Sequence, residues 1–399
     1  MKRLMIFPFD IEHEERHLAE LDEWHERIDR KRPLTRRWAS RLRRDLEAEA
    51  VAASTRMEGV PVTVEDVRQI LAGEPPKTVS AHDYQLVRGY RDAMTYVLRR
   101  ADDPNFEWNR ELLVGIQDRV LAGHYEDGAG RPRISPSLVA NRDTGEIVFR
   151  PAPYEDVPNL VDRLCETFAS SDWHPAVGAA WIHVAVAAIH PFKDGNGRTA
   201  RILSSLVMYR SGFRTRTFTS LEEWWGRHPD DYYRAFNCLG DRFSPNVDVT
   251  PFIGAHITAQ VSQVHALDLR ERTQRGLWTM LENLLVDRDL NERITNALWD
   301  AFFGRSITAG YYRNFTDVSA GTATADLKAA TAADLLVAVG ERRARRYIAG
   351  QKLYEALVAE LGLEERPTSA EMGRSMVITE LSHRLIPSEL RQPALFPTE

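Results

Sequence analysis

The sequence predicts a mainly α-helical protein in which strands are confined to two short hairpins. Charged residues recur at helical spacing through most of residues 11–105. The stretch from Pro175 to His190 is rich in Ala, Val, Ile and Trp and predicts a buried helix, and a second helical pattern runs from Arg198 to Tyr209. With 399 residues, the chain is long enough for two or three domains with substantial cores.

We divide the chain into three regions. Residues 1–105 form an N-terminal helical region whose pattern is interrupted by a loop at 73–77, where Gly-Glu-Pro-Pro-Lys disfavours a continuous helix. Residues 106–262 form the central domain, and residues 263–399 form a C-terminal domain. The last stretch, 366–399, has scattered prolines and few periodic signals, which predicts a loosely attached tail.

A β-hairpin is expected at residues 138–150. Two short apolar runs flank a stretch of Asn, Asp and Gly that favours a turn. The pattern alone is equally typical of an ordinary surface hairpin.

Residues 190–201, His-Pro-Phe-Lys-Asp-Gly-Asn-Gly-Arg-Thr-Ala-Arg, are the most informative stretch of the chain. Gly195 and Gly197 permit backbone conformations in which successive N–H groups converge, and a helix that starts there favours negative charge. Arg198 and Arg201 are three residues apart on that helix, so both guanidinium groups can reach the same side. The segment therefore predicts a cradle for a polyphosphate.

Two further residues of this segment suggest chemistry on the bound anion. Asp194 lies at the mouth of the cradle, where a carboxylate suits Mg²⁺, a cation that prefers carboxylate and phosphate oxygens. His190, whose unperturbed pKa is about 6.5, is suited to act as a general base near neutral pH.

The segment resembles the signature of the Fic family, His-Pro-Phe-x-(Asp/Glu)-Gly-Asn-Gly-Arg-x-x-Arg, and matches it at every specified position. Members of this kind have a helical core with a β-hairpin flap and transfer AMP from ATP to a Ser, Thr or Tyr hydroxyl of a target protein. The resemblance implies that His190 deprotonates the target hydroxyl. It also implies that Asp194 holds the Mg²⁺ that bridges the α- and β-phosphates.

The remaining signature residues would bind the phosphates. Asn196 and the backbone amides of Gly195 and Gly197 would stabilise the charge that develops in the transition state. Arg198 would hold the β-phosphate and Arg201 the γ-phosphate.

The resemblance also bears on the type of transfer and on further contacts. Related Doc-type proteins carry Lys at the place of Gly197 and transfer a phosphoryl group, so the glycine favours nucleotidyl transfer. The hairpin at 138–150 would be the flap that clamps the target segment by adding it as a strand. Tyr233 is a candidate contact for the adenosine, with buried helix packing as an equally good alternative.

The stretch from Ser54 to Gly59 matches the inhibitory pattern of the family, (Ser/Thr)-x-x-x-Glu-(Gly/Asn), and precedes the core, an arrangement called class II. The Glu58 carboxylate would form an ion pair with Arg201 and make this arginine unavailable to the γ-phosphate. ATP would then bind with its α-phosphate misaligned for attack. In some relatives the same glutamate supports removal of AMP from the target.

The C-terminal domain resembles a winged helix-turn-helix, a module that some Fic proteins carry after the core. Helices are expected at 291–303, 308–315 and 321–336, with Ser319 as the N-cap of the third. Residues 337–348 then predict two strands around a basic tip.

DNA binding by this module is left open. Four arginines at the tip suit phosphate contacts: Arg342, Arg343, Arg345 and Arg346. The helix that would read bases is poor in suitable side chains, since residues 322–326 are Thr-Ala-Thr-Ala-Asp and Lys328 is the basic residue nearby. We therefore favour a protein contact or a homodimer over DNA recognition.

The composition is that of a cytoplasmic protein with no membrane partner. The net charge of −6 gives no bias toward nucleic acid or anionic lipid. Two cysteines, Cys165 and Cys238, provide neither a disulfide framework nor a metal cluster. The apolar run at the start is too short for a signal peptide.

We therefore expect an ATP- and Mg²⁺-dependent protein adenylyltransferase restrained by Glu58, acting on a target protein or on itself. Two alternatives remain open. One is a hydrolase that removes AMP through the same site, and the other is a DNA-binding regulator whose Fic domain senses nucleotide.

Overall fold

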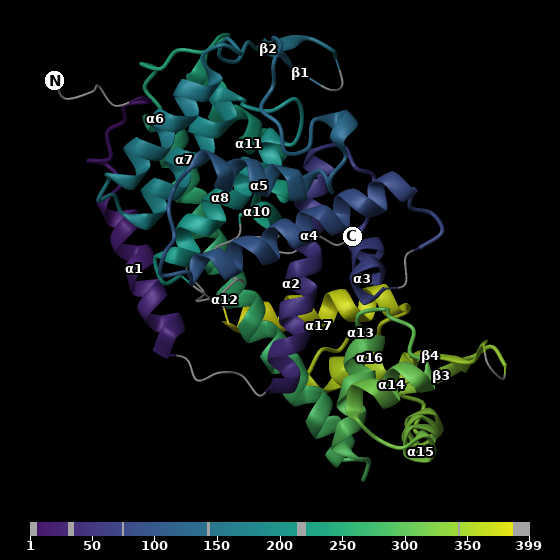
Figure 1. Ribbon diagram of the computed structural model, residues 1–399. Coiled ribbons are helices and arrows are strands. Elements are labelled where there is room, and N and C mark those ends of the chain that lie inside the picture. Colours follow the sequence, from purple (N-terminus) through teal and green to yellow (C-terminus); the bar gives the residue numbers. More distant parts are fainter. Residues whose placement is uncertain are drawn as a thin grey trace. The chain divides into compact units, whose positions relative to one another are not determined.

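The computed structural model describes residues 6–30, 36–73, 76–141, 144–213, 221–341 and 344–385 and confirms a mainly α-helical fold (Figure 1). Two antiparallel two-stranded sheets account for the named strands among these residues. The chain divides into two compact units, Met1–Val264 and His265–Glu399. No helix within the described ranges is long and apolar enough to cross a membrane.

The first unit begins with the expected charged helices. They are α1 (Glu15–Arg30), α2 (Arg36–Met57), α3 (Val64–Ala72) and α4 (Ala81–Ala101). Thr63 and Asp66 form a reciprocal capping box at the start of α3, and Gly73 ends this helix in a left-handed conformation. Ser80 caps α4 by accepting the N–H of Asp83. The predicted loop is present between α3 and α4, although its residues 74 and 75 lie outside the described part of the chain.

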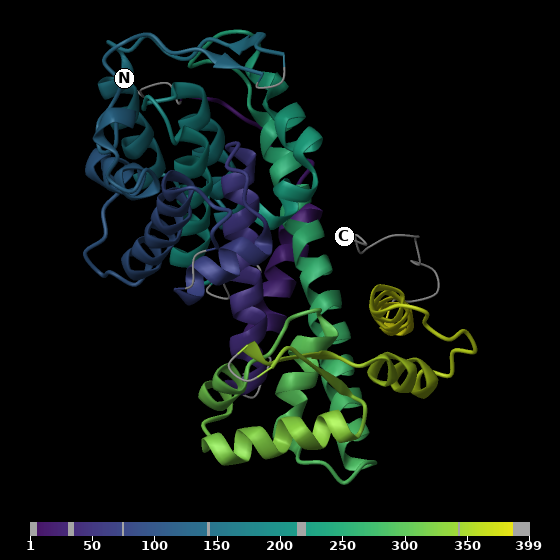
Figure 2. The ribbon, with the colours of Figure 1, turned by 90° about the vertical axis from the view of Figure 1, so that its right-hand side faces the viewer.

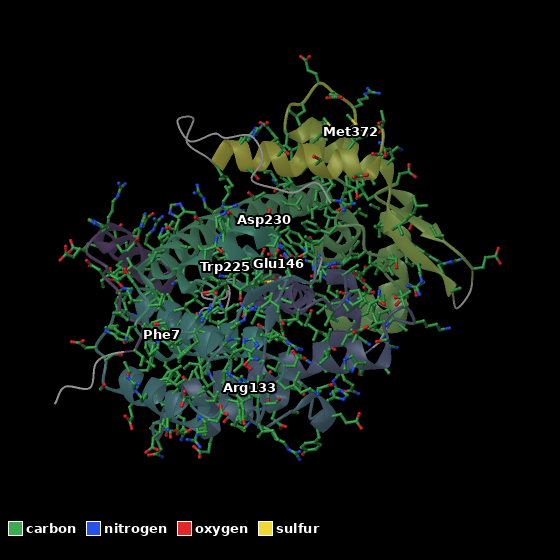
Figure 3. All side chains as sticks on the ribbon, turned by 90° about the horizontal axis from the view of Figure 1, so that it is seen from above. Phe7, Arg133, Glu146, Trp225, Asp230 and Met372 are labelled. Atoms are coloured by element: carbon green, nitrogen blue, oxygen red, sulfur yellow. The ribbon has the colours of Figure 1, made fainter. Side chains whose placement is uncertain are left out.

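Two helices that lie side by side form the centre of this unit. The elements here are α5 (Arg110–Val120), η1 (Tyr125–Asp127), α6 (Val157–Ala169), α7 (Pro175–Ile189) and α8 (Asn196–Arg210). Helix α7 is apolar on all sides and almost wholly buried, which confirms the prediction and explains its position inside the unit. Helix α7 packs along α8. Its Trp181 indole N–H donates to the carbonyl of Phe7, which is labelled in Figure 3, at 3.1 Å.

The predicted hairpin is confirmed as β1 (Val139–Ala140) paired antiparallel with β2 (Ile147–Phe149). It lies at one edge of the first unit in both views (Figures 1 and 2). The unit continues with α10 (Glu222–Arg227), α11 (Pro229–Ala235), η2 (Phe236–Leu239) and the start of α12 (Thr250–Val286). Trp225 of α10 is buried together with Tyr232 of α11.

The second unit contains the expected order of three helices and two strands. These are η3 (Glu292–Ile294) with α13 (Thr295–Phe302), then α14 (Ala309–Thr316), α15 (Ala320–Ala332), β3 (Leu336–Val339) and β4 (Arg346–Ala349). Ser319 caps α15 as predicted, accepting the Thr322 N–H at 3.1 Å. Helix α15 ends four residues before the expected limit of 336, because Asp334 is left-handed and Leu336 already belongs to a strand.

The winged-helix assignment and the choice between DNA and protein as its partner stay predictions. Arg345, which precedes β4, and Arg346, the first residue of β4, are exposed. Arg342 and Arg343 lie outside the described residues.

The prediction of a loose tail from 366 is wrong for residues 370–385. They form α17 (Ala370–Leu385), which packs on α16 (Gln351–Glu360). The buried residues Gly373, Val377 and Leu381 recur every four residues, but a glycine in this stripe weakens the apolar pattern. Its lack of a side chain is what permits the contact, since a Cβ on Gly373 would lie 2.6 Å from the Cβ of Tyr354. Residues 386–399 lie outside the described part.

We expect Gly373→Ala to destabilise the protein by about 1–3 kcal/mol, because the added methyl group overpacks the contact with Tyr354. Urea unfolding of the full chain, followed by tryptophan fluorescence, measures the change. The matched control is Gly321→Ala in α15, where the nearest atom to an added Cβ is the Ser319 hydroxyl at 3.7 Å. Equal stability of the two variants would contradict the packing argument.

Candidate active site

The loop between α7 and α8 is shaped by two left-handed residues. His190 ends α7 with φ 53° and ψ 60°, and its N–H donates to the Val186 carbonyl at 2.9 Å. Gly195 precedes α8 with φ 80°, a conformation that glycine adopts without steric cost. The chain therefore turns sharply at both ends of the loop, and this brings His190 close to the first turn of α8.

The Asn196 side chain holds the loop closed. Its Oδ1 accepts the Phe192 N–H and its Nδ2 donates to the Phe192 carbonyl, both at 2.9 Å. Phe192 itself is buried and anchors the loop in the core. The Asn196 side-chain amide is thus engaged in hydrogen bonds within the loop. Its backbone N–H belongs to the first turn of α8.

Two residues that the sequence did not single out support the loop from outside. Arg133, labelled in Figure 3, donates through Nε to the His190 carbonyl at 2.7 Å, and its backbone N–H donates to the Pro191 carbonyl at 2.9 Å. Gln117 of α5 donates through Nε2 to the Asp194 carbonyl at 3.0 Å. Both bind backbone carbonyls, and no pattern of side chains in the sequence indicates such contacts.

Arg198 is a buried cation with unused donors. It is 2% exposed, and its Nη2 lies 3.2 Å from Asp194 Oδ2. Its Nε and Nη1 are buried and have no hydrogen-bond partner among the described residues. Because unpaired buried donors are costly, a guanidinium in this state at a helix N-terminus is well suited to a bound anion.

Arg201 is also buried, but its donors are engaged. Nε donates to Ser54 Oγ at 2.9 Å and Nη1 to the Tyr232 hydroxyl at 3.0 Å. Nη2 donates to the Ser54 carbonyl at 3.1 Å and to Glu58 Oε1 at 2.9 Å. The expected pair between Glu58 and Arg201 is therefore present. Tyr232 is a member of this cluster that we did not predict, and burial raises its pKa to about 12, so it remains a neutral phenol.

The Glu58 carboxylate lies directly against the first turn of α8. Helix α2 ends at Met57, and Gly59 turns the chain with φ 81°. A Cβ built on Gly197 would lie 2.5 Å from Glu58 Oε1. The missing side chain of Gly197 thus makes room for a carboxylate at the positive end of the helix.

His190 is held in its neutral form. Burial lowers the pKa of its imidazole to about 4, although Glu58 and Asp194 act in the opposite direction. The pKa is thus lower than the unperturbed value that we assumed from the sequence. At neutral pH the ring is free of charge and can accept a proton.

Tyr233 is 54% exposed, and its hydroxyl donates to the Met57 carbonyl at 3.2 Å. Buried packing, the alternative that we considered for Tyr233, instead describes its neighbour Tyr232. A contact of Tyr233 with adenosine stays a prediction.

The buried histidines next to this site should make stability depend on pH. Burial lowers the pKa of His256 to about 3, below its value in the unfolded chain, so the unfolded state binds more protons as the pH falls below about 6.5. The unfolding free energy therefore decreases from pH 7 to pH 5. In His256→Asn we expect a slope shallower by up to about 1.4 kcal/mol per pH unit.

Urea unfolding at several pH values measures this slope. The exposed His13 provides the control variant, His13→Asn, which should keep the wild-type slope. If His256→Asn also kept it, protonation of His256 would not be the cause.

Comparisons with known proteins find a matching family and similar sequences. The Fic/DOC family matches residues 107–208. A protein adenylyltransferase Fic from Nematostella vectensis is 30% identical over 206 residues, which cover 50% of this chain and 44% of the relative. A protein of the same name from Aedes aegypti is 27% identical over 198 residues, which cover 47% of this chain and 38% of the relative. The chain thus spans less than half the length of these relatives.

Solved structures show the same fold. A Fic family protein from Desulfovibrio desulfuricans G20 superposes with a TM-score of 0.53 at 20% identity, over 84% of this chain and 94% of that protein. Fic-1 (residues 134–508) from C. elegans gives 0.52 at 22% identity, over 66% and 74%. The matched segment contains the α7–α8 loop with its complete signature, and residues 107–208 of this chain form a Fic domain of the Fic/DOC family.

Proposed function

We propose that this chain is a protein adenylyltransferase that transfers AMP from ATP to a Ser, Thr or Tyr hydroxyl of a target protein. The observation that carries the proposal is the buried Arg198, whose Nε and Nη1 lack partners in the described structure at the start of α8. A polyphosphate would supply the missing acceptors and would meet the positive end of the helix. The names of the relatives support the same activity.

The proposed Mg²⁺ site fits the side chain present. The Asp194 carboxylate is 52% exposed, accepts the Gly195 N–H at 2.6 Å and pairs with Arg198, which leaves lone pairs on both oxygens. One protein carboxylate together with substrate phosphates is a common way to hold Mg²⁺. When bound, the ion would neutralise charge on the α- and β-phosphates.

His190 would act as the general base. The target hydroxyl loses its proton to the imidazole while its oxygen bonds to the α-phosphorus. The bond from that phosphorus to the bridging oxygen breaks, and pyrophosphate leaves. The lowered pKa of His190 keeps the imidazole neutral at the working pH, and the Arg133 hydrogen bond to its carbonyl holds the residue in place.

The hairpin would hold the target segment. Ile147 and Val148 of β2 are exposed, so apolar side chains of this strand are accessible to a target segment that adds to the hairpin.

Glu58 would restrain this reaction. Arg201 could hold the γ-phosphate only after releasing the carboxylate, which already occupies the space beside Gly197. Ser54 contributes by fixing the guanidinium through Nε, so that Arg201 faces Glu58. A phosphate and the carboxylate would compete for the same donors, and ATP bound with Glu58 in place would be misaligned.

The decisive experiment compares incorporation of label from α-labelled ATP with Mg²⁺, on the protein itself and on a cell extract. We expect Glu58→Gly to raise incorporation by about 100-fold, the effect of realigning a substrate by about 1 Å. Glu58→Gln keeps the size of the side chain but loses its charge. A rate between those of the wild type and Glu58→Gly would show that the ion pair and the volume of the side chain each contribute to the restraint. Glu58→Gly/His190→Ala should show no label. Absence of label in every variant would overturn the proposal.

Removal of AMP by the same site is a second candidate. Burial lowers the pKa of His190, and the charge of the nearby Glu58 carboxylate offsets part of this effect; a carboxylate close to the imidazole suits a shared role in activating water. Target protein labelled by Glu58→Gly and then purified provides the substrate. Release of labelled AMP by the wild-type protein, with none by Glu58→Gly, would support removal of AMP by this site. Release by neither protein would exclude that activity.

A further inference from the structure

Three metal-ligating side chains from separate elements meet on the first unit, apart from the proposed active site. His82 belongs to the first turn of α4, His124 to the loop after α5, and Asp127 ends η1. One ligand atom from each lies within 4.8 Å of the other two. The two imidazole rings are 5.2 Å apart and inclined by 58°, so they are not stacked on each other.

The hydrogen bonding of this cluster is incomplete. His124 Nε2 is buried and has no hydrogen-bond partner among the described residues. Asp127 forms no ion pair with a side chain in the described ranges. A buried ring nitrogen without a partner is costly, and a metal ion would supply one. The buried Nε2 of His124 distinguishes this cluster from a group of exposed acidic side chains that lie close together by chance.

The backbone brings the three residues together firmly. Ala122 and Gly123 are both left-handed, with φ of 51° and 73°, and they turn the chain after α5 back toward α4. Helices α4 and α5 pack closely, and Gly89 of α4 leaves no space for a Cβ beside the Arg119 carbonyl. The segment that carries His124 and Asp127 is thus anchored at its start by the packing of α5 on α4.

We propose that His82, His124 and Asp127 form a binding site for a divalent transition-metal ion, with Zn²⁺ as the expected occupant. Two imidazoles and one carboxylate suit this cation, and water would complete a tetrahedral set. Metal–ligand bonds of about 2.0–2.2 Å require the ligand atoms to draw together. The exposed His82 has room to move for this purpose.

The ion would connect α4 to the segment that supports the catalytic loop. The Glu126 carbonyl accepts Lys193 Nζ at 2.8 Å. Gln117 donates to the Gly128 carbonyl at 3.3 Å and to the Asp194 carbonyl at 3.0 Å. The segment that contains Asp127 is therefore connected by these hydrogen bonds to the α7–α8 loop. The proposed metal site is separate from the proposed Mg²⁺ position at Asp194.

The test uses the full chain without a histidine tag, stripped of metal and titrated with Co²⁺, whose visible absorption reports an ordered site of low coordination number. Zn²⁺ is then added as a competitor. We expect one Co²⁺ per chain, displaced by Zn²⁺. Because changes to residues around a metal already cost about 10–100-fold in affinity, loss of a ligand in His82→Asn, His124→Asn or Asp127→Asn should weaken binding by at least about tenfold.

Two controls make the result specific. His13→Asn removes an exposed histidine elsewhere, and Asp194→Asn removes the carboxylate proposed for Mg²⁺; both should retain the Co²⁺ spectrum and affinity. Circular dichroism confirms folding, and His82→Asn decides the question if the other two variants unfold. No stoichiometric binding by the wild type, or wild-type affinity in His82→Asn, would overturn the proposal.

Discussion

The buried charge of Arg201 is the constraint around which the first unit is arranged. A guanidinium removed from water must be surrounded by acceptors, and these come from segments far apart in the sequence. Ser54 and Glu58 belong to α2 and the turn after it, and Tyr232 belongs to α11. One buried cation thereby links α2, the turn after it and α11 to α8.

The surroundings of Arg201 suggest how Glu58 would exert the proposed restraint. The Glu58 carboxylate lies at the helix end where an anionic ligand would be attracted, and Gly197 provides the space for it. Release of Glu58 would expose part of the Arg201 charge unless another anion took its place. A phosphate is such an anion, so the internal and external ligands are alternatives for a single site rather than additive contacts.

The sequence allowed the helical class, the hairpin and the α7–α8 loop to be predicted, because their signals are local in the chain. Glu58 and Ser54 were accessible through a short motif. Tyr232 and Arg133 were not, because their roles arise from tertiary packing and from bonds to backbone carbonyls. Helix α17 was missed because close packing at Gly373 replaces the apolar residue that a periodic pattern would show.

The left-handed backbone of His190 has a consequence for variation at this position. A residue with a side chain pays about 1–2 kcal/mol for this conformation, whereas glycine adopts it freely and asparagine tolerates it well. Substitutions that relax the turn would thus remove the imidazole. For the general base that we propose, selection for stability and selection for chemistry would act in opposite directions at this position. Persistence of histidine in a lineage would then indicate that the proposed reaction is retained.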